Sequence, residues 1–396
     1  MKNQTKNLKY GFTTGTCAAA AATGAYLFLR KILSKQETSI NDSFQNISLP
    51  IKNQIPVLLP DNKTIDIHYS IIHADYSSVT VEVIKDAGDD PDITNHIPIR
   101  VNASYINTSD IKKEDYSIIL NSSKLILSSN GGIGIVTKKG LDADFGKWAI
   151  NSVPRKMILD NLRHNGFEND KNKILKISIE AVNGTEIAKK TLNKMLGVIG
   201  GLSILGTSGI VVPYSNAAYI KTIEILIKSL NAEGFNELAL VTGNKTKKAL
   251  LKTCPTLEES QIIRIADFIG ASLEAVAKFN FKTVHIACMP GKLYKYACGN
   301  YYTHAHKTAL DMSLLILELQ NFNLPQNIMD KLKSSKSVAE AMTFLNEDTI
   351  KKILNILAIK ALNNLKKWAN NINIKIYVFT SDNEDSKPIL QLFHKI

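Results

Sequence analysis

The sequence predicts a chain of two domains, an N-terminal α+β domain over residues 1–204 and a C-terminal α/β domain with a mostly parallel sheet over residues 205–396. Two observations lead to this fold class. The 396 residues exceed the ~100–200 residues of a single domain. Strand-like and irregular segments dominate the first half, whereas strands and amphipathic helices alternate in the second. Such alternation is typical of a parallel sheet covered by helices.

The first half should begin with a helix and continue with strands. The stretch "YGFTTGTCAAAAA" leads into a helix expected over about residues 18–33. Apolar and polar residues alternate in "VTVEVIK", which favours a half-buried strand. In "INSVPRKMILDNLRHNG", a first-turn proline and Gly166 delimit a second helix. Further strand-like segments lie at residues 55–60, 64–74, 124–141 and 173–184.

The second half alternates helices with buried strands. "NAAYIKTIEILIKSLNAEGF" predicts an amphipathic helix, and "ELALVTGN" and "TVHIACMPGK" predict strands that end in glycine. One helix is expected over residues 260–281 and long helices over about residues 304–371, before a late strand in "IKIYVFTSDNE". Ligands of parallel sheets bind beyond the carboxyl ends of the strands. Gly243, Gly291 and Asp382 lie at such ends.

Composition indicates a soluble cytoplasmic protein. Hydrophobic residues make up 44% and charged residues 21%, as in ordinary globular chains. No apolar run reaches the ~18 residues that span a bilayer. The start, "MKNQTKNLKYGF", lacks the apolar stretch of a signal peptide. The four cysteines form no CxxC pair, which suits a reducing compartment.

The formal net charge of +12 favours anionic partners: nucleic acid, an anionic membrane or a polyanionic small molecule. A solvated, lysine-rich surface explains the same charge, so both interpretations stay open. We predict no structural metal site, because the chain lacks the Cys/His spacing of zinc sites. His304 and His306 are two residues apart and would not share one face of a helix.

The small residues of the opening stretch allow two interpretations. A threonine before an alanine run is a good helix N-cap, so the stretch could be a capped helix packed against its neighbours. Helix N-termini also bind anions, and small side chains let a ligand approach closely. Cys17 would then lie in the first turn, where the pKa of a thiol can fall.

An acidic loop and two glycine-rich turns are further candidates. "KDAGDDPDIT" holds four aspartates, which could bind a hard cation, supply a proton acceptor or form an acidic surface turn. Its spacing is not that of an EF-hand. "SSNGGIGIVTKKGL" and "VIGGLSILGTSGIV" contain neither GxGxxG nor a P-loop, so they are weak indicators of nucleotide binding.

Together these segments resemble the cobalt-precorrin-5B (C1)-methyltransferases of anaerobic cobalamin biosynthesis. The resemblance spans residues 9–310 and is carried by "YGFTTGTCAAAAA", "VIKDAGDDPDIT", "GGIGIVTKKGL", "AINSVPRKMI", "GGLSILGTSGIVVP" and "GKLYKYACGNYYTHAH". It implies transfer of a methyl group from S-adenosyl-L-methionine to carbon 1 of cobalt-precorrin-5B, an anionic tetrapyrrole, giving cobalt-precorrin-6A. It implies neither a nucleic-acid nor a membrane partner. The oligomeric state, a homo-oligomer included, stays open.

The site residues expected for this function fall into three groups. Asp89 and His304 are the candidates for a proton acceptor. Arg155, Lys292 and Lys295 are candidate anchors for substrate carboxylates. The residues expected to bind substrate or cofactor are Thr13, Thr14, Gly15, Thr16, Asp86, Gly88, Asp90, Asn151, Arg155, Gly206, Thr207, Gly209, Gly243, Asn244, Gly291, Lys292 and Thr303.

The chain departs from the family pattern in two places. "THAH" stands where the family has "THSR", so an arginine anchor is missing or replaced. "VTGNKTKKAL" stands where a proline-glycine-asparagine turn and a tyrosine are usual, although Gly243 and Asn244 are kept.

Two other functions compete with methyl transfer. The glycine-ended strands would suit a nucleotide-dependent oxidoreductase, but the GxGxxG fingerprint is absent. The positive charge would suit a non-catalytic binder of nucleic acid or of a tetrapyrrole, but no recognisable nucleic-acid module is present.

Overall fold

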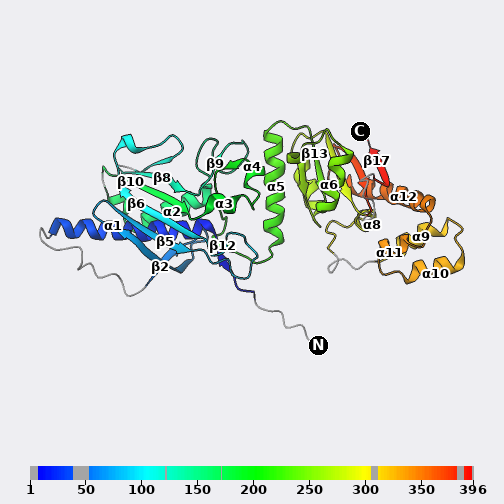
Figure 1. The fold of residues 1–396 in the computed structure, drawn as a ribbon, viewed down its shortest axis with the longest axis horizontal. Helices are drawn as coiled ribbons and strands as arrows, with labels where there is room; N and C mark the ends of the chain where they lie inside the picture. Colours follow the sequence, from blue (N-terminus) through cyan, green and yellow to red (C-terminus); the bar gives the residue numbers. More distant parts are fainter. Residues whose placement is uncertain are drawn as a thin grey trace, which may run out of the picture. The chain divides into compact units, whose positions relative to one another are not determined.

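A computed structural model describes residues 8–38, 53–120, 123–170, 172–304, 311–380 and 388–394 (Figure 1). Two residues singled out in the sequence, His306 and Asp382, lie outside these ranges. The protein has a mixed α/β fold with several sheets. Contacts divide the chain into two compact units, Met1–Ser215 and Asn216–Ile396.

The first unit is built on a six-stranded sheet in the order β4-β5-β6-β10-β8-β7. Neighbouring strands run antiparallel except β10 and β8, which are parallel. Buried and partly exposed residues alternate along β5 and β6, as expected of strands with one face in the core. The strands are β4 (Ser70–Ala74), β5 (Ser78–Ile84), β6 (Pro98–Tyr105), β7 (Tyr116–Leu120), β8 (Ser123–Gly131) and β10 (Ile174–Ala181).

The described residues of this unit also form three two-stranded antiparallel ribbons and several helices. The ribbons are β1 (Gly11–Phe12) with β12 (Ile210–Val211), β2 (Gln54–Leu58) with β3 (Thr64–His68), and β9 (Ile135–Val136) with β11 (Val198–Ile199). The helices are α1 (Thr14–Thr38), α2 (Ser152–His164), α3 (Gly184–Ala188) and α4 (Asn193–Leu196), with 3₁₀ turns at Thr108–Asp110 and Phe167–Asn169.

Helix α1 packs against β5, β6 and α2 and lies in the core of the unit. Its five consecutive alanines are fully buried, so their small side chains let the helix lie close to the sheet. The helix begins at Thr14, earlier than the predicted start at about residue 18. The side chain of Thr13 explains this start, because its hydroxyl accepts the backbone N–H of Thr16 at 3.2 Å.

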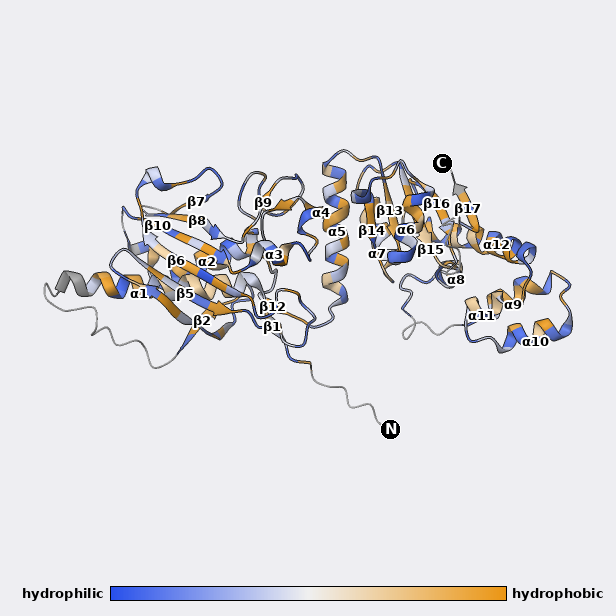
Figure 2. Cartoon of the chain, in the orientation of Figure 1, coloured by the Kyte–Doolittle hydropathy of each residue, from blue (hydrophilic) through white to orange (hydrophobic). Residues whose placement is uncertain are grey.

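The second unit contains a five-stranded sheet in the order β14-β13-β15-β16-β17. The first four strands are parallel and β17 is antiparallel to β16. The central strands are almost wholly buried, and Figure 2 shows them mostly in the orange of hydrophobic residues. The strands are β13 (Glu237–Val241), β14 (Ile262–Arg264), β15 (Thr283–Cys288), β16 (Asn373–Val378) and β17 (Leu390–His394).

The predicted single helix over residues 260–281 is wrong. The segment forms a 3₁₀ turn, then strand β14, and only then helix α7 (Ile269–Ala277). Ile262 and Ile263 are buried and β-branched, and they pair with β13. Ala266 adopts a left-handed φ of 48°, which separates the strand from the helix.

Helices surround the sheet of the second unit. Long helices were predicted over residues 304–371; in the described part, residues 311–371, the chain forms four shorter ones, because Pro325, Ser337 and Asn346 each stand at a helix N-cap. None of the helices in the described ranges has the length and apolar character needed to cross a bilayer. The helices are α5 (Asn216–Ala232), α6 (Asn244–Thr253), α7, α8 (Pro290–Ala297), α9 (Ser313–Gln320), α10 (Gln326–Ser334), α11 (Val338–Met342) and α12 (Glu347–Leu365).

Candidate functional site

A cavity of about 730 Å³ opens at the carboxyl ends of β13 and β15 in the second unit, and we call it the switch-point pocket. Its walls come from the loop after β13, the start of α6, the start of α8 and the start of α11. The residues that line it are Thr242, Gly243, Asn244, Lys245, Thr246, Met289, Gly291, Lys292, Lys295, Thr303, Lys336, Ser337, Val338 and Ala339.

The strand order explains why the pocket lies there. Numbered along the chain, the sheet reads 2-1-3-4-5, so the connections from β13 and β15 leave toward opposite sides. The loops therefore separate at the point where the strand order reverses, and ligands of open α/β sheets bind at such a switch point. Helices α6 and α8 begin directly after these two strands, which brings their N-termini to the same edge of the sheet.

The two glycines of the pocket are not required by the backbone or by packing. Gly243 has an extended φ of −172°, which any residue can adopt. A Cβ atom built on Gly243 or on Gly291 would meet no atom within 4 Å. Gly270 differs, because its Cβ would overlap the ring of Tyr301. The open space beside Gly243 and Gly291 leaves their backbone accessible to a ligand.

A network of two lysines, a threonine and an aspartate closes one side of the pocket. The Lys292 ammonium forms an ion pair with Asp267 and donates to the Thr303 hydroxyl at 3.0 Å. The Lys295 ammonium donates to the carbonyl of Thr303 at 2.9 Å. Burial lowers the pKa of Lys295, and the nearby Lys292 charge lowers it further, while Asp267 opposes both effects. The network therefore holds two amines in fixed positions beside the cavity.

The threonines of the opening stretch bind the protein's own backbone. The Thr14 hydroxyl accepts the N–H of Leu205 at 2.9 Å, and the Thr16 hydroxyl donates to the carbonyl of Gly209 at 2.6 Å. The N–H of Gly15 donates to the Leu205 carbonyl at 3.0 Å. Thr13, Thr14 and Thr16 are buried. Through these hydrogen bonds, the opening stretch holds the loop over residues 203–209 in place.

That loop contains three of the predicted binding residues, Gly206, Thr207 and Gly209. Gly206 and Gly209 have positive φ angles of 139° and 81°, and added side chains would overlap Thr13 and Leu59, so both glycines are needed for the turn. Thr207 is exposed. Of these three, only Thr207 presents an accessible side chain.

The acidic loop is organised by lysines. Asp86 pairs with the Lys9 ammonium at 2.6 Å and accepts the N–H of Gly88 at 2.8 Å. The hydrogen bond from Lys9 and that from Gly88 lower the pKa of Asp86. Asp89 is exposed and accepts the backbone N–H of Lys9 at 2.7 Å, and Asp90 accepts the N–H of Tyr214 at 2.9 Å.

Arg155 and Asn151 lie at the start of α2. Asn151 is the N-cap residue of this helix. The Arg155 guanidinium lies 4.0 Å from the centroid of the Tyr116 ring and 3.5 Å from the carboxylate of Asp144. Its buried Nε atom has no hydrogen-bond partner. The Asp142 carboxylate accepts the N–H of Ser152 at 2.7 Å, so a side chain of the protein already binds the positive N-terminal end of α2.

The predicted site residues thus fall into two groups, one in each unit. Gly243, Asn244, Gly291, Lys292 and Thr303 line the switch-point pocket. His304 directly follows Thr303, and its ring stacks on that of Tyr302 with centroids 5.9 Å apart. Lys295, a predicted carboxylate anchor, also lines the switch-point pocket. The remaining residues lie in the first turns of α1 and α2 or in the loops around them, in the first unit.

Comparison with models of known protein families shows which family the chain belongs to. The model described as CbiD matches residues 1–213, and that described as CbiD, C-terminal domain, matches residues 302–385. The chain belongs to the CbiD family.

Curated relatives support the same assignment across nearly the whole chain. Proteins named cobalt-precorrin-5B C(1)-methyltransferase are 33% identical in Dechloromonas aromatica (93% of this chain, 87% of the relative) and 32% identical in Thermosipho africanus (95% of both). A solved structure, the cobalamin biosynthesis protein cbiD from Archaeoglobus fulgidus, is 24% identical with a TM-score of 0.36, covering 74% of this chain and 80% of that one.

Sequence reasoning about this CbiD chain missed part of the pocket wall. Asp267, which pairs with Lys292 but does not itself line the pocket, was missed because the segment that contains it was expected to be helical, whereas it follows strand β14. Lys336 and Ser337 lie in a helical region where the sequence shows no motif. A short run of buried isoleucines before Ala266 was the available signal for β14.

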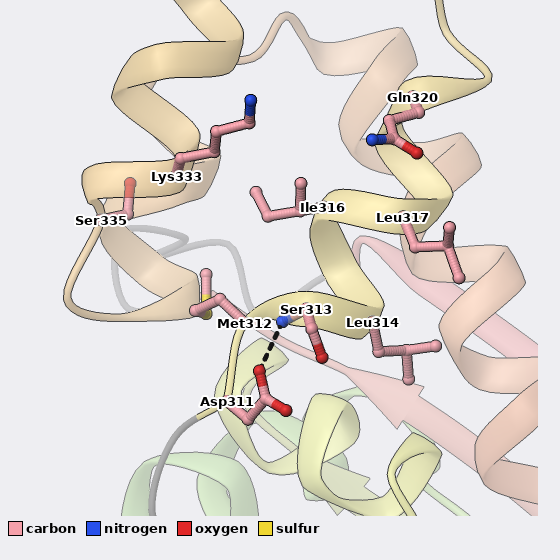
Figure 3. Close-up of a pocket in the computed structure, with 9 residues that line it drawn as sticks. All are labelled: Asp311, Met312, Ser313, Leu314, Ile316, Leu317, Gln320, Lys333 and Ser335. Atoms are coloured by element: carbon pink, nitrogen blue, oxygen red, sulfur yellow. Dashed lines mark hydrogen bonds between the residues drawn. The ribbon is translucent and has the colours of Figure 1, made fainter.

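A second cavity of about 780 Å³ lies between α9 and α10 of this CbiD chain (Figure 3). Ile316, Leu317 and Met312 give it an apolar wall, and Lys333 extends toward it from α10. Its polar groups include Asp311, which accepts the N–H of Ser313, the first residue of α9, at 2.8 Å. The residues that line it were not predicted site residues.

Proposed function

We infer that this chain transfers a methyl group to carbon 1 of cobalt-precorrin-5B and so produces cobalt-precorrin-6A in anaerobic cobalamin biosynthesis. The observation that carries this function is the 33% identity to a cobalt-precorrin-5B C(1)-methyltransferase over 93% of the chain. We propose S-adenosyl-L-methionine as the methyl donor.

The reaction follows from the chemistry of a sulfonium donor. An enamine-like ring carbon attacks the methyl group, the new carbon–carbon bond forms, and the carbon–sulfur bond breaks. The sulfonium becomes the neutral thioether of S-adenosylhomocysteine. Such a displacement needs chiefly in-line positioning of the two reactants. The protein's principal task in this proposal is to hold an anionic macrocycle and a cationic donor in register.

Asp89 and His304 remain the proposed proton acceptors. Asp89 already accepts a backbone N–H from Lys9, and its side chain is exposed. His304 follows a residue of the switch-point pocket and is only partly exposed. We therefore expect His304→Ala to lower kcat more than Asp89→Asn does, with little change in the KM for either substrate.

An anaerobic assay with methyl-labelled S-adenosyl-L-methionine tests the function. The purified full chain should transfer label to cobalt-precorrin-5B generated by the preceding pathway enzymes, and the product should show the mass of cobalt-precorrin-6A. A chain that is folded and binds S-adenosylhomocysteine, yet leaves the tetrapyrrole unlabelled, would contradict the proposal. The same assay with NADPH in place of the methyl donor tests the oxidoreductase alternative.

A further inference from the structure

We propose that the switch-point pocket binds carboxylate side chains of the tetrapyrrole, and that the methyl donor binds outside this pocket. The inference rests on the proposed function and deepens it, because it assigns one of the two substrates to a specific cavity.

The charges that line the pocket point to an anionic ligand. Four lysines, Lys245, Lys292, Lys295 and Lys336, lie on its walls, and none of the described lining residues carries a carboxylate. The N-termini of α6 and α8 add the positive ends of two helix dipoles at the same sheet edge. A polycarboxylate would therefore be stabilised by every charged group that lines the cavity.

The network around Thr303 prepares part of this charge in advance. Asp267 neutralises one ammonium and orients Lys292. Among the described residues, no other acidic side chain bonds to the Lys292 or Lys295 ammonium. Two lysines beside one carboxylate leave an excess of positive charge. Lys245 and Lys336 lie on other walls and are exposed, so they can reorient toward a ligand.

The same charges disfavour the donor. S-adenosyl-L-methionine carries a sulfonium and an ammonium against a single carboxylate, so it is a net cation at neutral pH. Bringing its sulfonium among several ammonium groups is unfavourable because like charges repel more strongly away from bulk water. The electrostatics of the cavity thus separate the two substrates of the reaction.

The shape of the pocket accommodates groups at the edge of a macrocycle. The cavity of about 730 Å³ lies within the usual range of ligand pockets and has room for several acidic side chains of the macrocycle. The open space beside Gly243 and Gly291 lets a carboxylate reach the backbone at the two helix starts.

Binding measurements on a charge-matched pair of variants test this assignment. The test variant is Lys245→Gln/Lys336→Gln, which removes two exposed pocket charges. The control is Lys248→Gln/Lys352→Gln, which removes two exposed charges from α6 and α12 that do not line the pocket. Uroporphyrin III, a stable tetrapyrrole polycarboxylate, serves as the anionic probe, and its affinity is followed by fluorescence. Calorimetry gives the affinity for S-adenosylhomocysteine.

We expect the test variant to bind uroporphyrin III about tenfold more weakly than the control, which corresponds to about 1.4 kcal/mol, with unchanged affinity for S-adenosylhomocysteine. Loss of S-adenosylhomocysteine binding with intact porphyrin binding would place the donor in the pocket and overturn the inference. Equal porphyrin affinities in the two variants, or no porphyrin binding by the unmodified chain, would also overturn it. Circular dichroism verifies that both variants are folded.

These measurements are independent of the labelling assay. Failure of methyl transfer with pocket-dependent porphyrin binding would reject the proposed function and keep the pocket assignment. Active methyl transfer with equal porphyrin binding by the two variants would keep the proposed function and reject the pocket assignment.

Discussion

Small residues serve opposite purposes at two places in this protein. A Cβ atom on Gly15 would lie 2.8 Å from Cγ of Pro154 and 3.1 Å from the carbonyl oxygen of Leu205, so packing excludes a side chain there. A Cβ on Gly291 would meet nothing within 4 Å. Glycine at 15 therefore maintains the contact between α1 and its surroundings, whereas glycine at 291 keeps a cavity wall open.

Alanine substitutions at these two glycines should separate packing from binding. Gly15→Ala should lower the free energy of unfolding by about 1–2 kcal/mol, because overpacking outweighs the gain in helix propensity. Gly291→Ala should leave stability unchanged or raise it by up to about 1 kcal/mol. Trp148 fluorescence reports on the first unit and Trp368 fluorescence on the second, each read in a chain with the other tryptophan replaced by phenylalanine. A stable Gly15→Ala variant would refute the packing role.

Cys17 is a packing residue in this structure. Its side chain is fully buried, and burial raises the pKa of the thiol to about 12, although the charge of Lys85 acts in the opposite direction. The thiol therefore stays protonated at neutral pH and is a poor nucleophile. Burial thus outweighs the lowering of the thiol pKa that a helix start can produce.

Replacement of Cys17 by alanine should leave catalysis intact. We expect kcat for methyl transfer to change less than about twofold, while the free energy of unfolding falls by about 1 kcal/mol because a small cavity forms. Iodoacetamide should modify the exposed Cys298 in the native chain and spare Cys17. A Cys17→Ala variant that is folded but inactive would show that the thiol takes part in the reaction.

At the scale of elements, the loop after β5 depends on one buried ion pair. The Lys85 side chain is only 2% exposed, and its ammonium lies 2.7 Å from the Asp92 carboxylate. Burial tends to raise the pKa of Asp92, but the Lys85 ammonium and the donors of Thr94 outweigh it, so the pKa is lowered. Ionised Asp92 therefore stabilises the fold above the pKa it has in the unfolded chain, and this contribution is lost as the pH falls through the folded value.

The variant Asp92→Asn should reveal this dependence. At about pH 7 the substitution leaves the Lys85 ammonium buried beside a neutral amide. We expect the free energy of unfolding to fall by about 3–5 kcal/mol. The difference in unfolding free energy from the unmodified chain should begin to shrink at about pH 3.5, below the usual pKa of about 3.9, because Asp92 then takes up a proton in the unfolded chain while the lowered pKa keeps it largely ionised in the folded one. Urea denaturation followed by Trp148 fluorescence gives both values. Asp66→Asn, an exposed position on β3, is the control. Equal losses at the two pH values would contradict the pairing.

Strand β14 shows where sequence reasoning about elements fails. The alternation of strands and helices around β13 and β15 was readable because both strands are buried and a glycine, Gly243 or Gly291, follows shortly after each. The three residues of β14 were assigned to the neighbouring amphipathic helix, because a short buried strand and a buried helical turn have a similar apolar content. Without β14 the strand order has no reversal, so the pocket position could not be derived, although Gly243 and Gly291 were already expected at strand ends.

For the whole molecule, the sequence motifs located regions of interest more reliably than they indicated what the residues in them do. Thr13 to Thr16 were expected to form either a ligand surface or a packed helix start, and their hydroxyls bind the chain's own backbone at residues 203–209. Hydrogen bonds between residues so distant in sequence arise from tertiary packing, which a single sequence does not reveal. Charge is a property that sequence and structure indicate alike: the net charge of +12 suggested an anionic partner, and four lysines line the switch-point pocket.

Ionic strength should therefore affect the two substrates differently. If lysines attract the tetrapyrrole carboxylates, raising the salt concentration from about 0.05 M to about 0.5 M shortens the Debye length well below about 10 Å and screens the attraction. We expect kcat/KM for cobalt-precorrin-5B to fall several-fold, while the KM for the cationic donor stays nearly constant or decreases. Steady-state assays under anaerobic conditions, with potassium chloride as the salt, give both quantities.

The Lys245→Gln/Lys336→Gln variant should show a shallower salt dependence of kcat/KM than Lys248→Gln/Lys352→Gln, because the first pair removes charges that the substrate would meet and the second does not. Parallel salt curves for the two variants would show that the positive charge acts over the whole surface instead of through the pocket.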